Sequence, residues 1–569
     1  MDILRVNITK LEANREPAPP PYEPWGGRGL IAKILSEEVQ PTCDPLGAHN
    51  KLIFAPGLLA GRGISSAGRL SLGGKSPLTG GIKESNVGGM AGDTMARLGL
   101  KAIVVEGQLP PDDIYLLQVG RKSSTFIPAA DYRGLGNYAL AEKLQARYGK
   151  EVVIISTGPA GESRLAAAGV AATDADGNPG RLAARGGLGA VMGAKGLKAI
   201  LLEDGGGRFT TPINDRDGLR EGIKRYVQAL REDEYTSYWF PEIGTPYMVQ
   251  RMQKLGGLPT HNFRYGNFDD VNELVGETIR QTILSRNGEG KTTHACMRGC
   301  VVRCSNIIPD EQGRGIVSPL DYESMIMLGP NLGIGSLDTI AHLNRLCNDC
   351  GLDTIEIGAA IGVAMEAGVL PFGDGEKVAE LLNEVARGTI LGRVLGQGAA
   401  VAGRVLGVPR TPTVKGQAIA AYDPRAVKGM GVTYATSPMG ADHTAGHTAD
   451  APVDHHSPEG QVDLSRGNQI TAAAWDTLGL CAFVTGATIG QPELILDLLR
   501  AIYGGEYPGD YIRELGKEVL RMERTFNRAA GFTSAQDRFP GYFRTEKLPP
   551  YDLVFDVPDE ELDKVFDFV

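Results

Sequence analysis

The chain has 569 residues, a length that indicates several domains or one large multilayer enzyme. Its composition, with 42% hydrophobic and 22% charged residues, excludes a disordered chain. The net charge is −10 and no long basic run occurs, so nucleic acid is not an expected partner. No run of about 18 apolar residues is present, and the N-terminus lacks a signal-like apolar segment. We therefore expect a folded cytoplasmic protein without membrane spans.

The first part of the chain combines short β-like runs with clusters of glycine. The runs cover residues 51–57, 102–107, 114–119, 151–157 and 199–203. The chain has 77 glycines, about twice the usual share, and the glycine clusters between the runs also hold Arg, Lys, Ser and Asn. Such loops suit an anionic ligand because their backbone N–H groups can approach it closely. We predict a β-rich domain over residues 1–205, with a boundary near 205–215.

Beyond this boundary the hydrophobic pattern changes to a helical one. Apolar residues recur at i, i+3, i+4 and i+7 in segments 217–233, 337–351, 353–368, 375–388, 471–484 and 492–504. The fold class predicted is α+β, with the β-rich N-terminal domain followed by two mainly helical domains, 206–405 and 406–569. No tandem repeat is evident. The apolar residues at the end of the chain, 561–569, are expected to dock on the rest of the protein.

Three of the seven cysteines lie within nine residues: Cys296, Cys300 and Cys304. An odd number of cysteines with this clustering favours metal ligation in a reducing compartment over a disulfide framework. A cubane iron–sulfur cluster requires four thiolates, so a fourth would come from Cys43, Cys347, Cys350 or Cys481. The alternatives are a zinc site that uses His294 or a distant cysteine, and unligated cysteines in the core.

Two short motifs are similar to each other. Asn348-Asp-Cys-Gly-Leu-Asp353 and Asp476-Thr-Leu-Gly-Leu-Cys481 each place a Gly-Leu pair after a polar residue. We call them the first and second Gly-Leu motifs. They suggest two similar halves of one ligand-binding site, although a Gly-Leu pair also marks an ordinary helix C-terminus.

Further motifs are Gly26-Gly-Arg-Gly29, Gly68-Arg-Leu-Ser71, Lys75-Ser-Pro-Leu-Thr-Gly80, Ser85-Asn-Val-Gly-Gly89, Ala184-Arg-Gly-Gly-Leu-Gly-Ala-Val-Met-Gly193 and Tyr322-Glu-Ser324. Together with both Gly-Leu motifs, they make the chain resemble the tungsten-containing aldehyde:ferredoxin oxidoreductases nearly from end to end. The resemblance implies a tungsten or molybdenum bis-pyranopterin beside one [4Fe–4S] cluster, on a β-rich base domain covered by two helical domains. It implies oxidation of an aldehyde to a carboxylic acid, with ferredoxin or an iron–sulfur subunit as electron partner. The sequence leaves homodimerisation open.

The resemblance also assigns residues. It implies that Cys296, Cys300, Cys304 and Cys481 hold the cluster. The cofactor-binding residues that it implies are Arg28, Arg69, Lys75, Asn86, Gly88, Ala184, Arg185, Gly186, Asn348, Asp353, Asp476, Gly479 and Leu480. Of these, Asn86 and Ala184 match positions whose carbonyls face a magnesium ion that bridges the pterin phosphates.

The chain departs from the family pattern at two places. The gap between the first two cysteines has three residues, where family members usually have two, so the cluster loop must differ. Asn348 replaces the usual aspartate, and its amide can accept a hydrogen bond from a pterin but carries no charge.

Oxidation of an aldehyde requires a base for the proton of water and a donor for the developing oxyanion. Glu323 matches the family's Tyr-Glu element and is the predicted base, with Asp321 as its rival; a capping or solvated carboxylate is the alternative for either residue. His443 is the predicted donor, with His447 as the alternative. His455 and His456 are expected on the surface.

Two other functions compete. The first is a different reaction on the same scaffold, the catalytic subunit of an aromatic acyl-CoA reductase; it would need cations for the CoA phosphates, and no dense basic cluster is visible. The second is an iron–sulfur electron-transfer subunit or a zinc-stapled structural subunit without a metal–pterin. The glycine-rich first domain argues against this second possibility.

Overall fold

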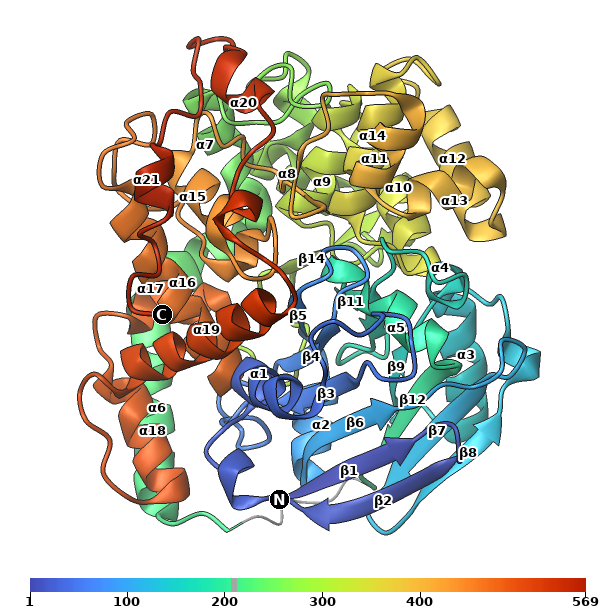
Figure 1. The fold of residues 1–569 in the computed structure, drawn as a ribbon, viewed down its shortest axis with the longest axis vertical. Coiled ribbons are helices and arrows are strands. Elements are labelled where there is room, and N and C mark those ends of the chain that lie inside the picture. Colours follow the sequence, from blue (N-terminus) through green and yellow to red (C-terminus); the bar gives the residue numbers. More distant parts are fainter. Residues whose placement is uncertain (206–211) are drawn as a thin grey trace.

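The computed structural model describes residues 1–205 and 212–569. The expected boundary near 205–215 overlaps residues 206–211, which lie outside the described part of the chain. The β-rich N-terminal region occupies the lower part of the molecule, and helices from the rest of the chain cover it from above and from one side (Figure 1). This arrangement confirms the predicted α+β fold with a β-rich N-terminal part and a helical remainder.

The N-terminal region contains two six-stranded sheets with the same topology. The strand orders are β2-β1-β6-β3-β4-β5 and β8-β7-β12-β9-β10-β11. In each sheet one pair is parallel, β1 with β6 and β7 with β12, and the other pairs are antiparallel. The first half consists of β1 (Asp2–Asn7), β2 (Glu12–Pro17), η1 (Pro20–Tyr22), α1 (Gly27–Glu38), β3 (Leu52–Pro56), β4 (Leu70–Lys75), β5 (Ile82–Val87), α2 (Ala91–Arg97) and β6 (Leu100–Glu106).

The second half repeats this order. It consists of β7 (Tyr115–Gly120), β8 (Ser124–Pro128), η2 (Ala130–Tyr132), α3 (Asn137–Tyr148), β9 (Val153–Ser156), α4 (Pro159–Glu162), β10 (Val170–Ala172), β11 (Arg181–Ala183), η3 (Arg185–Gly187), α5 (Leu188–Ala194) and β12 (Leu197–Glu203). The expectation that the chain lacks an internal repeat is therefore wrong at the level of topology. A sequence signal exists, because the pentapeptide Gly-Leu-Lys-Ala-Ile occurs at 99–103 and again at 196–200, where each half enters its last strand.

The two sheets enclose one apolar cluster, and α2 and α5 lie between them, each in contact with strands of both sheets. Phe54, Leu72 and Ile103 of the first sheet share one apolar cluster with Ile155 and Ile200 of the second. Helices cover the outer faces: α1 packs on β3 and β4, and α3 shares a cluster with β7, β9 and β12. Both faces of the central strands β3 and β6 are buried, so these strands are mostly apolar and lack the alternation of a half-exposed sheet.

Helices dominate the rest of the chain. The elements up to residue 406 are α6 (Arg216–Glu232), the π-helix η4 (Tyr235–Ile243), η5 (Thr245–Tyr247), α7 (Met248–Leu255), η6 (Val271–Leu274), α8 (Gly276–Arg286), β13 (Lys291–His294), β14 (Ser305–Pro309), β15 (Gly315–Val317), α9 (Tyr322–Leu328), η7 (Pro330–Leu332), α10 (Leu337–Cys350), α11 (Thr354–Glu366), α12 (Gly375–Arg387), α13 (Ile390–Gly396) and α14 (Ala399–Leu406).

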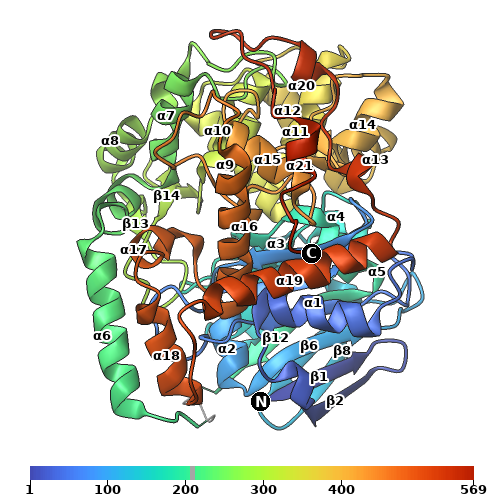
Figure 2. The same ribbon diagram turned by 60° about the vertical axis from the view of Figure 1, so that its left-hand side comes forward.

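The last part contains β16 (Thr413–Val414), β17 (Gln417–Ala418), α15 (Lys428–Thr436), η8 (His443–Ala445), α16 (Gln461–Leu478), η9 (Ala482–Val484), α17 (Thr485–Thr488), α18 (Glu493–Tyr503), α19 (Tyr511–Ala529), η10 (Ser534–Gln536), α20 (Tyr542–Thr545) and α21 (Asp559–Leu562). Both views place α6 beside α18, and α19 beside α1 and α16 (Figures 1 and 2). Val565 and Phe566 are buried, so the C-terminal segment docks on the rest of the protein, as predicted.

Within the described residues, no single helix combines the length and apolar composition of a membrane span. One pair of helical segments, Gln461–Leu478 and Ala482–Thr488, meets those criteria only jointly, with a bend of 117° between them.

Candidate functional site

Both Gly-Leu motifs lie at helix C-termini, as the simpler interpretation predicted. Gly351 ends α10 with φ 77° and Gly479 ends α16 with φ 81°, the left-handed conformation that favours glycine. The two helix ends also occupy equivalent places on the duplicated sheets. A Cβ atom on Gly57, directly after β3, would lie 2.1 Å from Cα of Gly479, and one on Gly158, just beyond β9, would lie 2.3 Å from the carbonyl oxygen of Cys350. The two halves of the N-terminal domain thus each receive one motif.

In the first motif, Asn348 has an unused hydrogen-bond donor. Its backbone carbonyl accepts a bond from Asn137 (2.8 Å), while its side-chain Nδ2 is buried without a partner. Asp353 caps α11 by accepting bonds from the backbone N–H groups of Ile355 and Glu356, and its second oxygen accepts from Arg185 at 3.2 Å. The asparagine therefore has a free group for a ligand, and the aspartate fixes the turn beside it.

In the second motif, Asp476 belongs to a network of hydrogen-bonded charged and polar side chains. Its oxygens accept bonds from Arg28 (3.3 Å) and from Nδ2 of Asn86 (3.1 Å), and Arg28 also binds Glu523 through two nitrogens. Burial raises the pKa of Asp476 to about 6, against the attraction of Arg28 and Arg69. Yet 18% of the Asp476 side chain is exposed, so this carboxyl group keeps some accessible surface.

The thiols of both chain regions converge on one side of this network. Cys296, Cys300 and Cys304 lie in the loop between β13 and β14, and Cys481 follows the second motif. Nη1 of Arg69 lies 4.0 Å from Sγ of Cys481, and Oγ of Ser66 lies 3.3 Å from Sγ of Cys300. A Cβ atom on Gly88 would lie 3.0 Å from Sγ of Cys296. Arg69 also donates to Oδ1 of Asn86, so it connects the thiols to the network around Asp476.

The other cysteines lie elsewhere. Cys347 and Cys350 are buried core residues of α10, and Cys43 lies in the loop after α1. Among the described residues, no three His, Cys, Asp or Glu side chains are arranged to hold a single metal ion. His294 has both ring nitrogens engaged, Nε2 with Asp176 at 2.9 Å and Nδ1 with Arg181 at 3.2 Å. These contacts count against a zinc site on His294. A polynuclear cluster places its thiolate ligands on different irons, so it does not require three ligands around one ion.

The predicted catalytic residues Glu323 and His443 lie together. Oε1 of Glu323, in the first turn of α9, is 3.6 Å from Nε2 of His443. The same oxygen accepts a 2.6 Å hydrogen bond from the hydroxyl of Tyr422. The side chains of Glu323 and His443 are 17% and 15% exposed. Burial is the largest cause of the lowered pKa of His443. A carboxylate and an imidazole thus lie side by side, and each keeps some accessible surface.

Asp321 faces a different neighbourhood from Glu323. Its Oδ1 lies 3.5 Å from Oγ1 of Thr245, and burial raises the pKa of Asp321 to about 6. Burial raises the pKa of the Cys304 thiol as well, and Asp321 contributes to this shift. Asp321 is thus on the thiol side, and no contact joins it to His443 among the described interactions.

The alternative histidine, His447, lies further from Glu323. Its ring contacts Tyr422 edge-on, with ring centroids 5.0 Å apart, and its Nδ1 is 3.8 Å from Asp450. Asp450 is exposed and accepts a 2.8 Å bond from Tyr247. The expected surface position is wrong for His455, which is 3% exposed and whose Nε2 lies 3.4 Å from Arg251. His456 is partly exposed and contacts the carbonyl of Leu255.

Some of the remaining predicted cofactor-binding residues lie beside the motifs described above, and one of them, Lys75, does not. Gly186 has φ 81°, a Cβ there would clash with the Lys83 side chain, and its carbonyl accepts from Ser76 at 2.8 Å, so the Ala184–Gly186 turn is fixed against β5. Leu480 is buried beside Gly479. Lys75 is not brought to this group, since its ammonium group donates to the carbonyls of Pro41 and Cys43.

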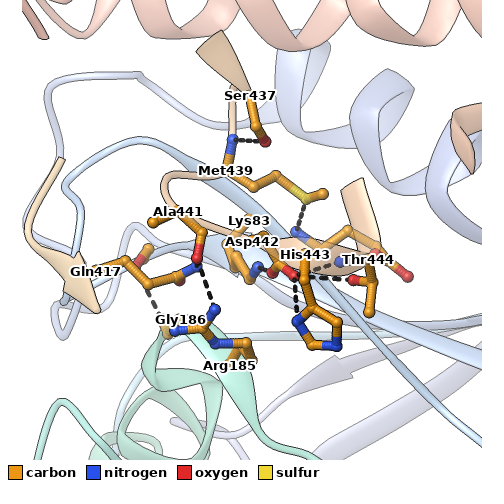
Figure 3. Close-up of polar contacts among 12 residues, drawn as sticks. Lys83, Arg185, Gly186, Gln417, Ser437, Met439, Ala441, Asp442, His443 and Thr444 are labelled. Atoms are coloured by element: carbon orange, nitrogen blue, oxygen red, sulfur yellow. Dashed lines mark hydrogen bonds and ion pairs between the residues drawn. The ribbon is translucent and has the colours of Figure 1, made fainter. Parts of the chain in front are cut away.

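Several contributors to the site escaped the sequence analysis. Tyr422 belongs to no motif, and Lys83 lies three residues before Asn86 in a strand that was not predicted. Asp442 directly precedes His443 and pairs with Lys83 (Figure 3). Adjacency to the predicted His443 was the one available signal, and it did not reveal the partner more than 350 residues away in sequence.

The polar groups suit a pterin-type ligand. Buried side-chain atoms without partners include Nδ2 of Asn348, Oε1 of Glu84, Oε1 of Gln417 and Nε1 of Trp475. Such groups are costly to bury unless a ligand or water satisfies them. Together with the partly exposed carboxyl group of Asp476, these residues provide both donors and acceptors for a heterocycle rich in N–H groups and carbonyls.

Comparisons with known proteins identify the family of the chain. A family model described as "Aldehyde ferredoxin oxidoreductase, N-terminal domain" matches residues 3–204, and one described as "domains 2 & 3" of the same enzyme matches residues 221–567. The tungsten-containing aldehyde ferredoxin oxidoreductase of Pyrococcus furiosus is 33% identical over 555 residues, covering 92% of this chain and 87% of the relative. That of Thermococcus kodakarensis is 33% identical over 578 residues, covering 96% and 91%.

A solved structure has a similar fold. The active site complex BamBC of benzoyl coenzyme A reductase, bound to 1,5-dienoyl-CoA, matches with a TM-score of 0.83 over 99% of this chain and 93% of that chain. The sequence identity is 19%, so this similarity concerns the fold alone.

Proposed function

The chain belongs to the tungsten-containing aldehyde ferredoxin oxidoreductase family, and on that premise we propose that it oxidises an aldehyde to a carboxylic acid. Membership makes the protein an oxidoreductase with a tungsten pterin cofactor. The observation that carries the proposed reaction is the grouping of Glu323, His443 and Tyr422, in which the hydroxyl and the imidazole both approach Oε1 of Glu323.

The proposed cofactor is a tungsten, or molybdenum, bis-pyranopterin. Asn348 with Asp353 would hold one pterin and Asp476 with Gly479 and Leu480 the other. Free or exposed polar atoms on Asn348 and Asp476 support this assignment. The additional residues proposed around the cofactor and its bridging magnesium ion are Arg28, Arg69, Asn86, Gly88, Ala184, Arg185 and Gly186. When bound, the cofactor supplies the acceptor for the two electrons of the oxidation.

The chain's own residues handle the proton and the oxygen. Conversion of an aldehyde and water to a carboxylic acid releases two electrons and two protons. The Glu323 carboxylate is proposed to accept a proton from water as its oxygen attacks the carbonyl carbon. The Nε2–H of His443 is proposed to donate to the carbonyl oxygen as negative charge develops there. Burial, together with Arg185 and Lys83, lowers the pKa of His443 to about 4, so the imidazole is neutral near pH 7 and can serve as this donor.

Electrons are proposed to leave through a [4Fe–4S] cluster held by Cys296, Cys300, Cys304 and Cys481. The contacts of Arg69 with Asn86 and Cys481 support a short route between the pterin network and the cluster. The proposed acceptor is ferredoxin or an iron–sulfur subunit.

Elemental analysis combined with an activity assay tests this function. Purified protein is expected to contain tungsten or molybdenum, phosphorus and about four irons per chain, and to reduce a viologen dye when an aldehyde is added. Protein with metal and pterin that instead reacts only with an aromatic acyl-CoA and a low-potential reductant would favour the acyl-CoA reductase alternative. Protein with zinc or iron but without pterin phosphorus would favour the electron-transfer or structural alternative.

A further inference from the structure

The loop that carries His443 is fastened to the N-terminal domain from several sides (Figure 3). Lys83, in β5, pairs through its ammonium group with the carboxylate of Asp442, the residue before His443. Nη1 of Arg185 donates to the carbonyl of Ala441 at 2.6 Å, and the N–H of Glu84 contacts Sδ of Met439 at 3.3 Å. The backbone position of His443 is therefore set by β5 and η3, which belong to the two halves of the N-terminal region that receive the Gly-Leu motifs.

The Lys83–Asp442 pair is almost fully buried. The Lys83 side chain is 0% exposed and that of Asp442 is 3% exposed. The other carboxylate oxygen of Asp442 accepts bonds from the N–H (3.1 Å) and the hydroxyl (2.9 Å) of Thr444. Removing two charges from water is expensive, and a buried ion pair is often no more stabilising than apolar side chains of similar volume. Stability alone therefore gives a weak reason for this pair.

The position of the pair beside the imidazole gives a stronger reason. Oδ1 of Asp442 lies 3.9 Å from Nδ1 of His443, a buried nitrogen without a hydrogen-bond partner. On the opposite side of the ring, Nε2 lies 3.6 Å from Glu323. The imidazole thus stands between two carboxylates, and two anions near a histidine favour its protonated form. A protonated His443 would form an ion pair with Glu323 and occupy the base.

From this arrangement we propose that Lys83 is a positioning residue that offsets the charge of Asp442, keeps His443 uncharged and leaves Glu323 free. The inference rests on the proposed roles of His443 and Glu323 in aldehyde oxidation. Lys83 itself touches neither residue's functional atoms and acts through Asp442.

The other charges around His443 agree with this role. The groups that face it are Asp442 beside it, Lys83 from β5, Arg185 from η3, Asp353 from the start of α11, Glu323 from α9 and His447 from the following turn. Burial lowers the pKa of His443, with Arg185 and Lys83 acting in the same direction and Asp442 and Asp353 opposing them. Loss of Lys83 would leave Arg185 as the remaining cation that offsets Asp442 among these groups, and would shift this balance towards imidazolium.

Three variants separate charge from packing. Lys83→Met removes the cation, Lys83→Arg keeps it, and the double variant Lys83→Gln with Asp442→Asn removes both charges while preserving shape. The matched control is Lys198→Met. Lys198 is another fully buried lysine, in β12 of the second sheet, and pairs with Glu162 of α4 rather than with the loop that carries His443. Metal and iron contents are measured for each protein.

The main readout is the pH profile of aldehyde-dependent dye reduction. In Lys83→Met the acid limb of kcat/KM is expected to move up by about one pH unit or more, with at least about a fivefold loss at pH 4 and little change at pH 7. Lys83→Arg, the double variant and Lys198→Met should keep the limb near its original position. An acid limb that stays in place in Lys83→Met, with activity lowered equally at every pH, would make Lys83 a structural residue only and overturn the proposal.

A second readout does not depend on catalysis. Diethylpyrocarbonate modifies the neutral imidazole, so the pH dependence of His443 modification, measured by mass spectrometry on the holoenzyme, reports its protonation. The inflection should rise in Lys83→Met and return in the double variant; an unmoved inflection contradicts the proposal. If this inflection moves while the protein never oxidises aldehydes, the charge relationship holds and the proposed function fails. Should Lys83→Met not fold, Lys83→Gln replaces it in both measurements.

Discussion

The hydroxyl of Tyr422 donates a 2.6 Å hydrogen bond to the oxygen of Glu323 that also lies 3.6 Å from Nε2 of His443. The Tyr422 hydroxyl and the His443 imidazole therefore approach the same carboxylate oxygen of Glu323. Tyr422 is fully buried between Tyr322 and the two histidine rings, so its hydroxyl cannot turn away to water. The bond holds the Glu323 carboxylate in one orientation, with Oε1 towards His443.

Tyr422→Phe removes this bond while keeping the ring. A hydrogen bond to a charged group contributes about 1.5–3 kcal/mol, so kcat/KM for an aldehyde should fall roughly 10- to 100-fold with normal tungsten and iron content. The measurement is steady-state dye reduction. Tyr322→Phe is the matched control, because its hydroxyl donates to the carbonyl of Ala421 instead (2.9 Å) and its loss should have a smaller effect. Equal losses in both variants would argue for a general packing defect.

The central elements of the fold were predictable from sequence, since their patterns are local. The apolar runs 51–57, 102–107, 114–119, 151–157 and 199–203 coincide with β3, β6, β7, β9 and β12, and six helical patterns coincide with helices. Strands β4 and β5 were missed because they consist largely of glycine and polar residues, yet both are buried. Their burial comes from neighbours distant in sequence, among them Ile31 against Gly73 and Asp442 against Lys83.

The candidate site was predictable only where residues belong to motifs. Glu323 and His443 came from family motifs, and the structure brings them together. Tyr422 and Lys83 enter through tertiary contacts that no local pattern encodes. The equivalent placement of the two Gly-Leu motifs likewise follows from the duplicated sheets, which the sequence conceals because the second half has shorter strands β10 and β11.

The fourth proposed cluster ligand is tested by Cys481→Ser. A hydroxyl is a poor iron ligand, so this variant should lose iron and the broad visible absorbance of the cluster. Iron per chain is measured by elemental analysis, with Cys43→Ser as the control because Cys43 lies apart from the converging thiols. Normal iron in Cys481→Ser would redirect attention to Cys347 or Cys350, both of which are buried in α10.

The two halves of the proposed pterin site are expected to differ. Asp476→Ala should reduce pterin retention more than Asn348→Ala, because an anionic acceptor forms stronger hydrogen bonds to pterin N–H groups than an amide does. Arg28 keeps its bidentate bond with Glu523 when Asp476 is replaced, so the fold around it should persist. Pterin per chain, measured by fluorescence after oxidative release, provides the comparison. Equal retention in the two variants would count against the charge argument.

The roles of Glu323 and His443 are tested together. Glu323→Gln and His443→Asn remove the base and the donor with little change in shape, and neither residue contributes to the proposed cluster or to the Gly-Leu motifs. Each variant should retain tungsten, pterin and iron, yet lose aldehyde-dependent viologen reduction by roughly 10²–10⁴-fold, the usual contribution of one positioned acid–base or oxyanion group. Because both side chains act on one transition state, the double variant should lose less than the product of the two single losses.

Asp321→Asn distinguishes the two acidic residues in this experiment. Asp321 lies on the thiol side, with burial raising its pKa to about 6, and lacks a described contact with His443. We expect Asp321→Asn to retain much more activity than Glu323→Gln. The reverse result, full activity in Glu323→Gln and collapse in Asp321→Asn, would transfer the base role to Asp321. Full activity in both variants would leave the reaction without a carboxylate base. His443 could not replace that base, because the nitrogen that donates to the substrate oxygen cannot also accept the proton from water. This outcome would remove the main support that the residues of this chain give to aldehyde oxidation.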